Sequence, residues 1–438
     1  MRRLWLVLGL AFCSLELVYL AIARLGDLRQ QADVFLWYAG AAVLIYLGVV
    51  WVLRRTRLPA LPAGQWLVCG MVLGGVAFRL TLLGLTPTLS DDVYRYLWDG
   101  RVQAAGINPY RYAPDDTALQ GLRTEEWTHI NHPHIPTVYP PLMQLAFRTG
   151  VRLAPTIHMQ KVVFLICDGL VILLLVVVLP RWGIHPLASL IYTWHPLVVV
   201  ETAASGHNDP WGVLWLLVGL WLWHERRRLT AAASLAMAFL AKMSTVILLP
   251  FFAVRARKPL AVFLAVIALG GASCLCSPHF TPGLRPYARD WEFNSSLFSL
   301  LLLVLRDPMV TRVVCGVVAV LIGAWMARRT EDLLAYTCVM IQAAILLFPV
   351  VEPWYLLWLI PLLCVRFSWV WLGFTGLVLL SYTVLVRYTH DGVWQISGWV
   401  KWVEYGPLYA WLLWRGWQRL AQVSNKAVSN QQPAVSSS

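Results

Sequence analysis

Charged residues are scarce in this chain of 438 residues: only 13% are Asp, Glu, Lys or Arg, whereas soluble globular proteins contain about 25%. Hydrophobic residues make up 59% of the chain, and its mean hydropathy is +0.64. Apolar runs close to the roughly 20 residues that span a bilayer recur along it. These features exclude an ordinary soluble domain and predict an all-α, polytopic membrane protein.

The sequence also lacks the patterns of a disulfide framework. Its eight cysteines include no CxxC pair and lie mostly within apolar runs, where a free cysteine packs as a small hydrophobic residue. No internal repeat is visible. The chain has 35 basic and 22 acidic residues, but its arginines cluster at the ends of apolar runs, as in membrane proteins. We therefore predict no nucleic-acid partner.

The basic clusters predict the topology, because cytoplasmic loops are enriched in Lys and Arg. Clusters at 54–57, 226–228, 255–258 and 328–329 are expected to face the cytoplasm. About 12–13 transmembrane helices are then expected. The predicted spans are residues 4–23, 33–53, 65–86, 161–180, 186–204, 210–224, 259–277, 308–327, 333–350, 354–367, 370–388 and 403–419.

The segment 229–254 does not fit a simple count of crossings. It is apolar, but both of its flanks are basic, and two crossings would need about 40 residues. A re-entrant pair of short helices that breaks near Lys242 solves this problem. Because irregular backbone at membrane depth is tolerated only beside protein or water, this segment also predicts a cavity.

We expect three parts along the chain. Residues 1–258 would form an N-terminal catalytic transmembrane module, which includes an external loop at 87–160 and the re-entrant segment 229–254. Residues 259–421 would form a C-terminal transmembrane module. Residues 422–438 are polar and are predicted to be a disordered cytoplasmic tail.

Charge is concentrated in one run of the external loop, LSDDVYRYLWDGRVQAAGINPYRYAPDD, residues 89–116. Ser90 is a suitable N-cap and Gly106 a suitable stop, so we predict an amphipathic helix on the outer membrane surface. Asp91 and Asp92 would lie in its first turn, where the helix dipole favours ionised carboxylates. Either could act as a general base, or both could simply mark a helix start.

Two further polar features interrupt apolar sequence. Residues 206–209, Gly-His-Asn-Asp, lie at the outer end of a predicted span, on the same side as Asp91; Asp209 followed by a proline would equally begin a helix. Lys242 lies within an apolar segment, which indicates a functional residue unless it snorkels to the interface. We expect Glu201 to be its partner.

Two weaker features complete the candidates. The segment HINHPHIPTVYPP, residues 129–141, has three histidines and four prolines, but no clear metal-ligand spacing, so we predict an ordered loop and assign no metal. Glu352 begins EPWY at the outer end of another predicted span and could line the cavity.

The run SDDVYRYLWDGRVQAAGINPYRYAP, together with TVYPP, GHND, AKMSTVILLP and EPWYLLWLIPLL, resembles the GT-C glycosyltransferases. More narrowly, it resembles bacterial members similar to mannosyltransferases that depend on polyprenyl-phosphate-mannose. The resemblance implies transfer of a hexose from a polyprenyl-phosphate donor to a glycan or lipid-linked acceptor, without a nucleotide-sugar cofactor. It also implies a bacterial inner membrane location with the active site facing outward, among membrane lipids.

The resemblance places a catalytic acidic residue in the first large external loop, where relatives carry Asp-Glu or Asp-x-Asp and this chain has Asp91 and Asp92. We favour Asp91 as the base, by its place as first of the pair. Because negative charge grows on the departing phosphate, preorganised cations should stabilise it. The expected donor-binding residues are Arg95, Tyr139, His207, Asp209, Lys242 and Glu352.

Two other functions remain open at this point. A secondary transporter would also use a broken helix and an intramembrane Lys/Glu pair, although it would not need paired carboxylates in a long external loop. An outer-face glycan polymerase or ligase would be a transferase with a diphosphate-linked donor.

Overall fold

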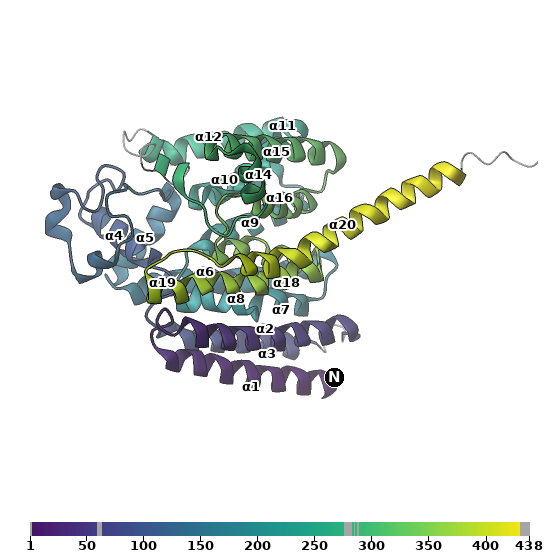
Figure 1. Ribbon diagram of the computed structural model, residues 1–438, viewed down its shortest axis with the longest axis horizontal. Coiled ribbons are helices and arrows are strands. Elements are labelled where there is room, and N and C mark those ends of the chain that lie inside the picture. Colours follow the sequence, from purple (N-terminus) through teal and green to yellow (C-terminus); the bar gives the residue numbers. More distant parts are fainter. Residues whose placement is uncertain (1, 59–63, 276–282, 284, 287–288, 430–438) are drawn as a thin grey trace, which may run out of the picture.

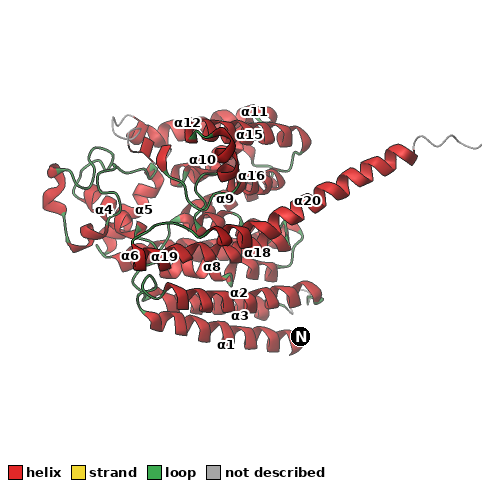
Figure 2. Ribbon diagram, in the orientation of Figure 1, coloured by secondary structure: helices red, strands yellow, loops and turns green. Residues whose placement is uncertain are grey.

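The computed structural model describes residues 2–58, 64–275, 283, 285–286 and 289–429 of the chain. Within these residues the secondary structure is helical, apart from one isolated bridge between Phe293 and Val350 (Figure 2). The predicted all-α class is confirmed. Six described helices are long and apolar enough to cross a membrane. They comprise residues 2–25, 32–55, 65–83, 157–182, 308–329 and 369–391.

The first three helices are α1 (Arg2–Leu25), α2 (Ala32–Arg55) and α3 (Gln65–Leu83), and they lie side by side (Figure 1). The buried residues of α1 recur every three or four positions, as expected for one packed helix face. Its opposite face exposes large apolar side chains, which suits contact with lipid. The buried set is Leu4, Leu8, Ala11, Leu15, Tyr19 and Ile22.

The external loop carries α4 (Asp92–Ala104), η1 (Thr117–Leu122), η2 (Glu125–His129) and α5 (Pro141–Leu153). These elements lie at one end of the bundle, opposite the N-terminus (Figure 1). Helix α4 packs so closely on α5 that a Cβ atom at Gly100 would lie 2.5 Å from the carbonyl oxygen of Phe147.

Two expectations for α4 need correction. Its N-cap is Asp91 rather than Ser90, although the Ser90 hydroxyl accepts a hydrogen bond from the Asp92 N–H at 3.3 Å. Its polar face is not a free surface, because Asp99 is buried against the rest of the loop. The amphipathic spacing of α4 is as predicted, but other residues of the external loop cover the polar face that we expected to meet water.

The middle of the chain continues with α6 (Ile157–Val178) and η3 (Leu179–Trp182). The predicted span 186–204 is an interrupted series of short helices rather than one helix. Pro196, at the start of the third piece, explains the interruption before it, because proline lacks an N–H and clashes with a preceding helical turn. The pieces are η4 (Pro186–Ser189), α7 (Leu190–Thr193), α8 (Pro196–Val199) and the π-helical η5 (Val200–Ala204).

The predicted break at Lys242 is confirmed. Helix α9 (Asp209–His224) packs against α10 (Arg228–Ala241), and Lys242 then adopts an extended conformation, with φ −155° and ψ 124°. The chain turns into η6 (Met243–Leu248) and α11 (Leu249–Arg255), followed by α12 (Arg257–Leu275). Two short helices therefore replace one span.

Some of the remaining helices pack against η6, whereas the last one projects from the bundle (Figure 1). Helix α20 continues through Ser429 and so includes the first residues of the predicted tail at 422–438, because extending an existing helix costs far less than nucleating one. Residues 430–438 of that tail lie outside the part of the chain that the structure describes. The elements are α14 (Leu297–Leu305), α15 (Pro308–Arg329), α16 (Leu333–Leu347), η7 (Pro353–Trp358), α17 (Ile360–Leu363), α18 (Trp369–Leu377), η8 (Val378–Tyr382), α19 (Thr383–Asp391) and α20 (Gly398–Ser429).

Candidate active site

Asp91 is held from outside the external loop. A guanidinium nitrogen of Arg29, in the turn between α1 and α2, donates to its carboxylate at 2.5 Å. The Nε of Arg29 also donates to the carbonyl of Thr88 at 2.9 Å, and the Leu28 N–H donates to the Thr88 hydroxyl. These hydrogen bonds hold the turn between α1 and α2 against the residues that precede α4. Arg29 was not among our candidates; its position in a short outer turn was the only sequence signal.

Asp92 points toward the interior of the bundle instead. Its Oδ2 lies 3.4 Å from the hydroxyl of Tyr96, which donates to it, and 3.9 Å from Nδ1 of His207. About a third of the side-chain surface remains accessible, at 34%. Because the surrounding groups exclude water, the pKa of Asp92 is raised to about 6; the charge of Lys242 opposes this shift.

His207 is buried beneath Asp92, with its ring stacked on Trp354 at a centroid distance of 3.9 Å and an interplanar angle of 18°. Its Nε2 lies 3.4 Å from Oε2 of Glu201. Burial, reinforced by the charge of Lys242, holds the pKa of His207 well below its usual range. The imidazole is therefore neutral and lies between two carboxyl groups.

Glu201 lies on the π-helical turn η5 and is fully buried. The hydroxyl of Tyr382, from η8, donates to its Oε1 at 2.8 Å. Our expectation that Glu201 pairs with Lys242 was wrong. The π-helical turn directs Glu201 toward His207 and Tyr382, and sequence spacing did not reveal this turn.

The partner of Lys242 is Asp209. Its Nζ donates to Oδ1 of Asp209 at 2.6 Å, and the same oxygen accepts from the indole N–H of Trp358 at 2.7 Å. The ammonium also lies 4.8 Å from the ring centroid of Tyr355. Lys242 keeps 23% of its side chain exposed, whereas Asp209 is fully buried. Part of the Lys242 side chain thus remains accessible.

Glu352 immediately precedes η7. Burial, together with the negative charges of Asp92 and Glu201, raises the pKa of Glu352 well above its usual range, and Lys242 opposes this only in part. The surroundings of Glu352 therefore favour its neutral form. The structure brings five of the predicted residues into mutual electrostatic range: Asp92, His207, Asp209, Lys242 and Glu352.

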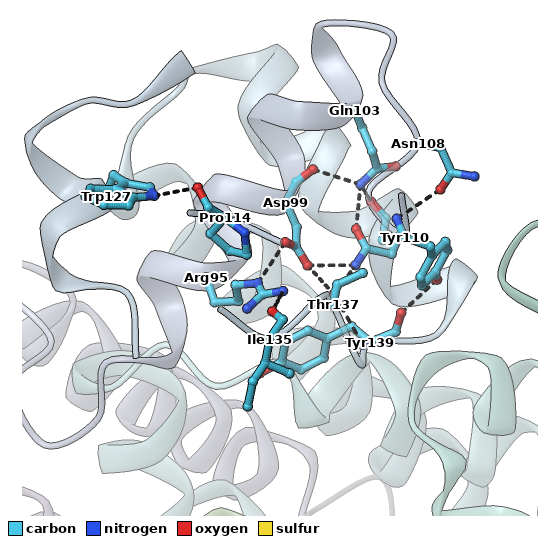
Figure 3. A network of polar contacts seen from close by, with 11 residues as sticks. Arg95, Asp99, Gln103, Asn108, Tyr110, Pro114, Trp127, Ile135, Thr137 and Tyr139 are labelled. Carbon is cyan, nitrogen blue, oxygen red and sulfur yellow. Dashed lines mark hydrogen bonds and ion pairs between the residues drawn. The ribbon is translucent and has the colours of Figure 1, made fainter. Parts of the chain in front are cut away.

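Arg95 belongs to a different cluster, shown in Figure 3. Its Nε donates to Oδ1 of Asp99 at 2.9 Å, and its Nη2 donates to the carbonyl of Ile135 at 3.0 Å. The other oxygen of Asp99 accepts from Thr137 at 2.5 Å and from Gln144 at 2.8 Å. This network ties α4 to the proline-rich segment 129–141.

Tyr139 links the two clusters. Its carbonyl accepts from the hydroxyl of Tyr110 at 2.7 Å (Figure 3). Its ring packs edge-on against Tyr96 with centroids 5.3 Å apart, and Tyr96 in turn reaches Asp92. Tyr139 therefore packs behind Tyr96 and supports α4, the helix that carries Asp92.

Many buried polar atoms of the segment 201–209 have no hydrogen-bond partner within the protein. They are Oε2 of Glu201, Oγ of Ser205, both ring nitrogens of His207, both amide atoms of Asn208 and Oδ2 of Asp209. Because buried polar groups are nearly always paired in folded proteins, such a concentration indicates a functional segment. In the part of the chain that the structure describes, no group of three or more His, Cys, Asp and Glu side chains is arranged to hold a metal.

Comparisons with known proteins identify the family of the chain. The family model described as "Alpha-(1->6)-mannopyranosyltransferase, N-terminal domain" matches residues 3–258. A probable alpha-(1->6)-mannopyranosyltransferase of Mycolicibacterium smegmatis is 26% identical over 364 residues, covering 65% of this chain and 63% of that protein. Alpha-(1->6)-mannopyranosyltransferase A of Mycobacterium tuberculosis is 25% identical over 272 residues, covering 58% and 50%.

The chain thus spans about half to two thirds of the length of these relatives. No solved structure matches it.

Proposed function

Because the chain belongs to the family of alpha-(1->6)-mannopyranosyltransferases, we propose that it is a membrane mannosyltransferase. In this proposal, mannose passes from a polyprenyl-phosphate carrier to a glycan or lipid-linked acceptor, without a separate cofactor, at the outer face of the bacterial inner membrane. The observation that carries it is the convergence of Asp92, His207 and Lys242, from three separate segments of the helical bundle.

Asp92 is the general base in this proposal. A base works best when its pKa lies near the working pH, and the pKa of Asp92 is about 6. Asp91, which we favoured from its place in the pair, forms an ion pair with Arg29, whereas Asp92 lies beside His207. We therefore assign Asp91 to positioning the start of α4.

The reaction follows from these assignments. The acceptor hydroxyl oxygen attacks the anomeric carbon, its proton passes to Asp92, and the bond between that carbon and the phosphate oxygen breaks. The departing phosphate keeps the bonding electrons, and the partly accessible Lys242 stabilises its growing negative charge. The raised pKa of Glu352 favours its neutral form, which limits electrostatic repulsion in the same space.

Arg95 has another role in this proposal. Its guanidinium already satisfies Asp99 and the Ile135 carbonyl, so it shapes the external loop instead of holding phosphate. The segment 129–141 then serves as the ordered support that its prolines predicted. A transporter has no need for this buried loop network beside a paired Lys242 and Asp209.

The test compares Asp92→Asn with Asp91→Asn in lipid vesicles, using radiolabelled mannosyl polyprenyl phosphate and octyl mannoside as acceptor. We expect Asp92→Asn to lower the transfer rate by about 100-fold or more. Asp91→Asn should retain measurable transfer, because Asp92 still supplies the base. Asp115→Asn, an exposed aspartate of the same loop, is the matched control.

The two variants also discriminate between alternatives. Loss of transfer in Asp91→Asn alone would make Asp91 the base. Full activity in both variants would exclude a general-base role for either aspartate. Absence of transfer by the wild-type protein, together with ion-coupled uptake into vesicles, would favour a transporter.

A further inference from the structure

The imidazole of His207 lies between two carboxyl groups that come from different parts of the chain. Its Nδ1 faces Oδ2 of Asp92 on α4 at 3.9 Å, and its Nε2 faces Oε2 of Glu201 on η5 at 3.4 Å. Stacking on Trp354 fixes the plane of the ring. The two ring nitrogens therefore face different carboxyl groups: Nδ1 faces the partly exposed Asp92, and Nε2 faces the buried Glu201.

The inner end of this arrangement is closed. Glu201 is fully buried, and Tyr382 donates to its Oε1 while its Oε2 has no hydrogen-bond partner in the protein. The outer end is open, since Asp92 retains accessible surface. A carboxyl group, an imidazole and a second carboxyl group thus form a row that runs from the surface to a buried end.

We infer that His207 and Glu201 form a proton relay behind Asp92, in which His207 is a positioning residue and Glu201 is the buried proton acceptor. This inference rests on the proposed function, because it assigns the fate of the proton that Asp92 removes from the acceptor hydroxyl.

The relay conserves protons and charge, and it starts from the ionised form of Glu201, which burial disfavours. Asp92 takes the hydroxyl proton and passes it to Nδ1 of His207, while the proton on Nε2 passes to Oε2 of Glu201. Asp92 is again a carboxylate, His207 is again neutral in its other tautomer, and Glu201 has become a carboxylic acid. After the product leaves, the reverse transfers return the proton through Asp92 to water.

The surrounding charges favour an added proton in this row. The groups that face it are Asp209 on α9, Lys242 at the break after α10, Glu352 before η7 and Tyr382 on η8. Lys242 is the single fixed cation among them, and Asp209 already pairs with it. Because carboxyl groups outnumber cations here, a proton that enters the row lowers electrostatic repulsion.

A purely structural histidine accounts for this geometry less well. A packing residue would leave at most one ring nitrogen without a partner, because a buried polar atom without a hydrogen bond is destabilising. Here both nitrogens lack a hydrogen bond and both face carboxyl oxygens. Such separations are common when catalytic hydrogen bonds tighten only with substrate bound.

The main test is Glu201→Gln, which keeps the shape of the side chain but cannot accept the proton as a carboxylate does. In the vesicle assay with mannosyl polyprenyl phosphate and octyl mannoside, we expect kcat to fall at least about 10-fold with KM unchanged. The solvent deuterium isotope effect on kcat should shrink, because fewer protons move in the slow step. His207→Gly should lose activity and regain part of it with added imidazole.

Glu404→Gln is the matched control, since Glu404 is a fully buried carboxyl group that bonds Asn294 at 2.7 Å outside the site. It should leave kcat and the isotope effect unchanged. Tyr382→Phe serves as a second variant if Glu201→Gln does not fold. Loss of its hydroxyl, which donates to Glu201 and stabilises the ionised carboxylate, should lower kcat, because less of Glu201 can then accept the proton.

The outcomes separate the two proposals. Wild-type kcat and isotope effect in Glu201→Gln, or a wild-type kcat in Tyr382→Phe, would overturn the relay. The proposed function would survive that result if the wild-type protein transfers mannose and Asp92→Asn does not. Failure of the wild-type protein to transfer mannose would overturn both.

Discussion

At the scale of single residues, the two adjacent aspartates differ through their partners. Asp91 forms an ion pair with Arg29, whereas Asp92 faces the neutral imidazole of His207 and lies near other carboxyl groups. Chain position alone made Asp91 the first choice, because the sequence does not show that Arg29 folds back to it. The difference in environment gives adjacent residues different acid–base chemistry.

The raised pKa of Asp92 leads to a prediction about pH. As a general base, Asp92 must be ionised, so the transfer rate should rise with pH and reach half its plateau near pH 6, the pKa of this group. The check is a series of initial transfer rates measured across that value. Residual activity in Asp92→Asn should lack this acid limb, and an unchanged limb there would assign it to another group.

The pair of Lys242 and Asp209 makes a second prediction. Lys242→Met leaves the fully buried Asp209 without its cation, which should cost about 3 kcal/mol of folding stability, seen as a lower Tm in detergent. The double variant Lys242→Met with Asp209→Asn should recover much of the Tm, because the buried charge is gone. It should remain unable to transfer mannose; recovered transfer would show that Lys242 does not act on the phosphate.

At the scale of elements, the close packing of α4 on α5 sets where Asp92 lies. Gly100→Ala would place a Cβ atom against the backbone of Phe147, so α4 must shift and carry Asp92 with it. We expect lower kcat and lower Tm, measured together. Gly121→Ala in the same loop meets no neighbouring atom within 4 Å and is the control; equal behaviour of the two variants would contradict this view of α4.

The break between α10 and η6 shows what patterning can predict for an element. Two basic flanks and an apolar length too short for two crossings were enough to predict the interruption at Lys242, since both are local properties of the sequence. The interruptions of the predicted span 186–204 were missed. Its prolines were visible, but a π-helical turn depends on packing with α3 and α6.

At the scale of the whole molecule, the site is not confined to the module at 1–258 that the family model matches almost entirely. Trp354 and Trp358 on η7 and Tyr382 on η8 contact His207, Asp209 and Glu201 respectively. We therefore predict that a fragment of residues 1–258 is inactive. Co-expression with residues 259–438 should restore transfer, and transfer by the fragment alone would show that the C-terminal helices are dispensable.

The sequence by itself determined the all-α membrane class, most helix positions, the break at Lys242 and the paired aspartates at the start of α4. These features follow from hydropathy, caps and charge within a short stretch of chain. Only the tertiary structure decided which side chains meet: Arg29 with Asp91 across 62 residues, Asp209 with Trp358 across 149, and Glu201 with Tyr382 across 181. Such partners are set by how helices pack against one another. The hydrophobic periodicity along one helix does not indicate which distant residues that helix will contact.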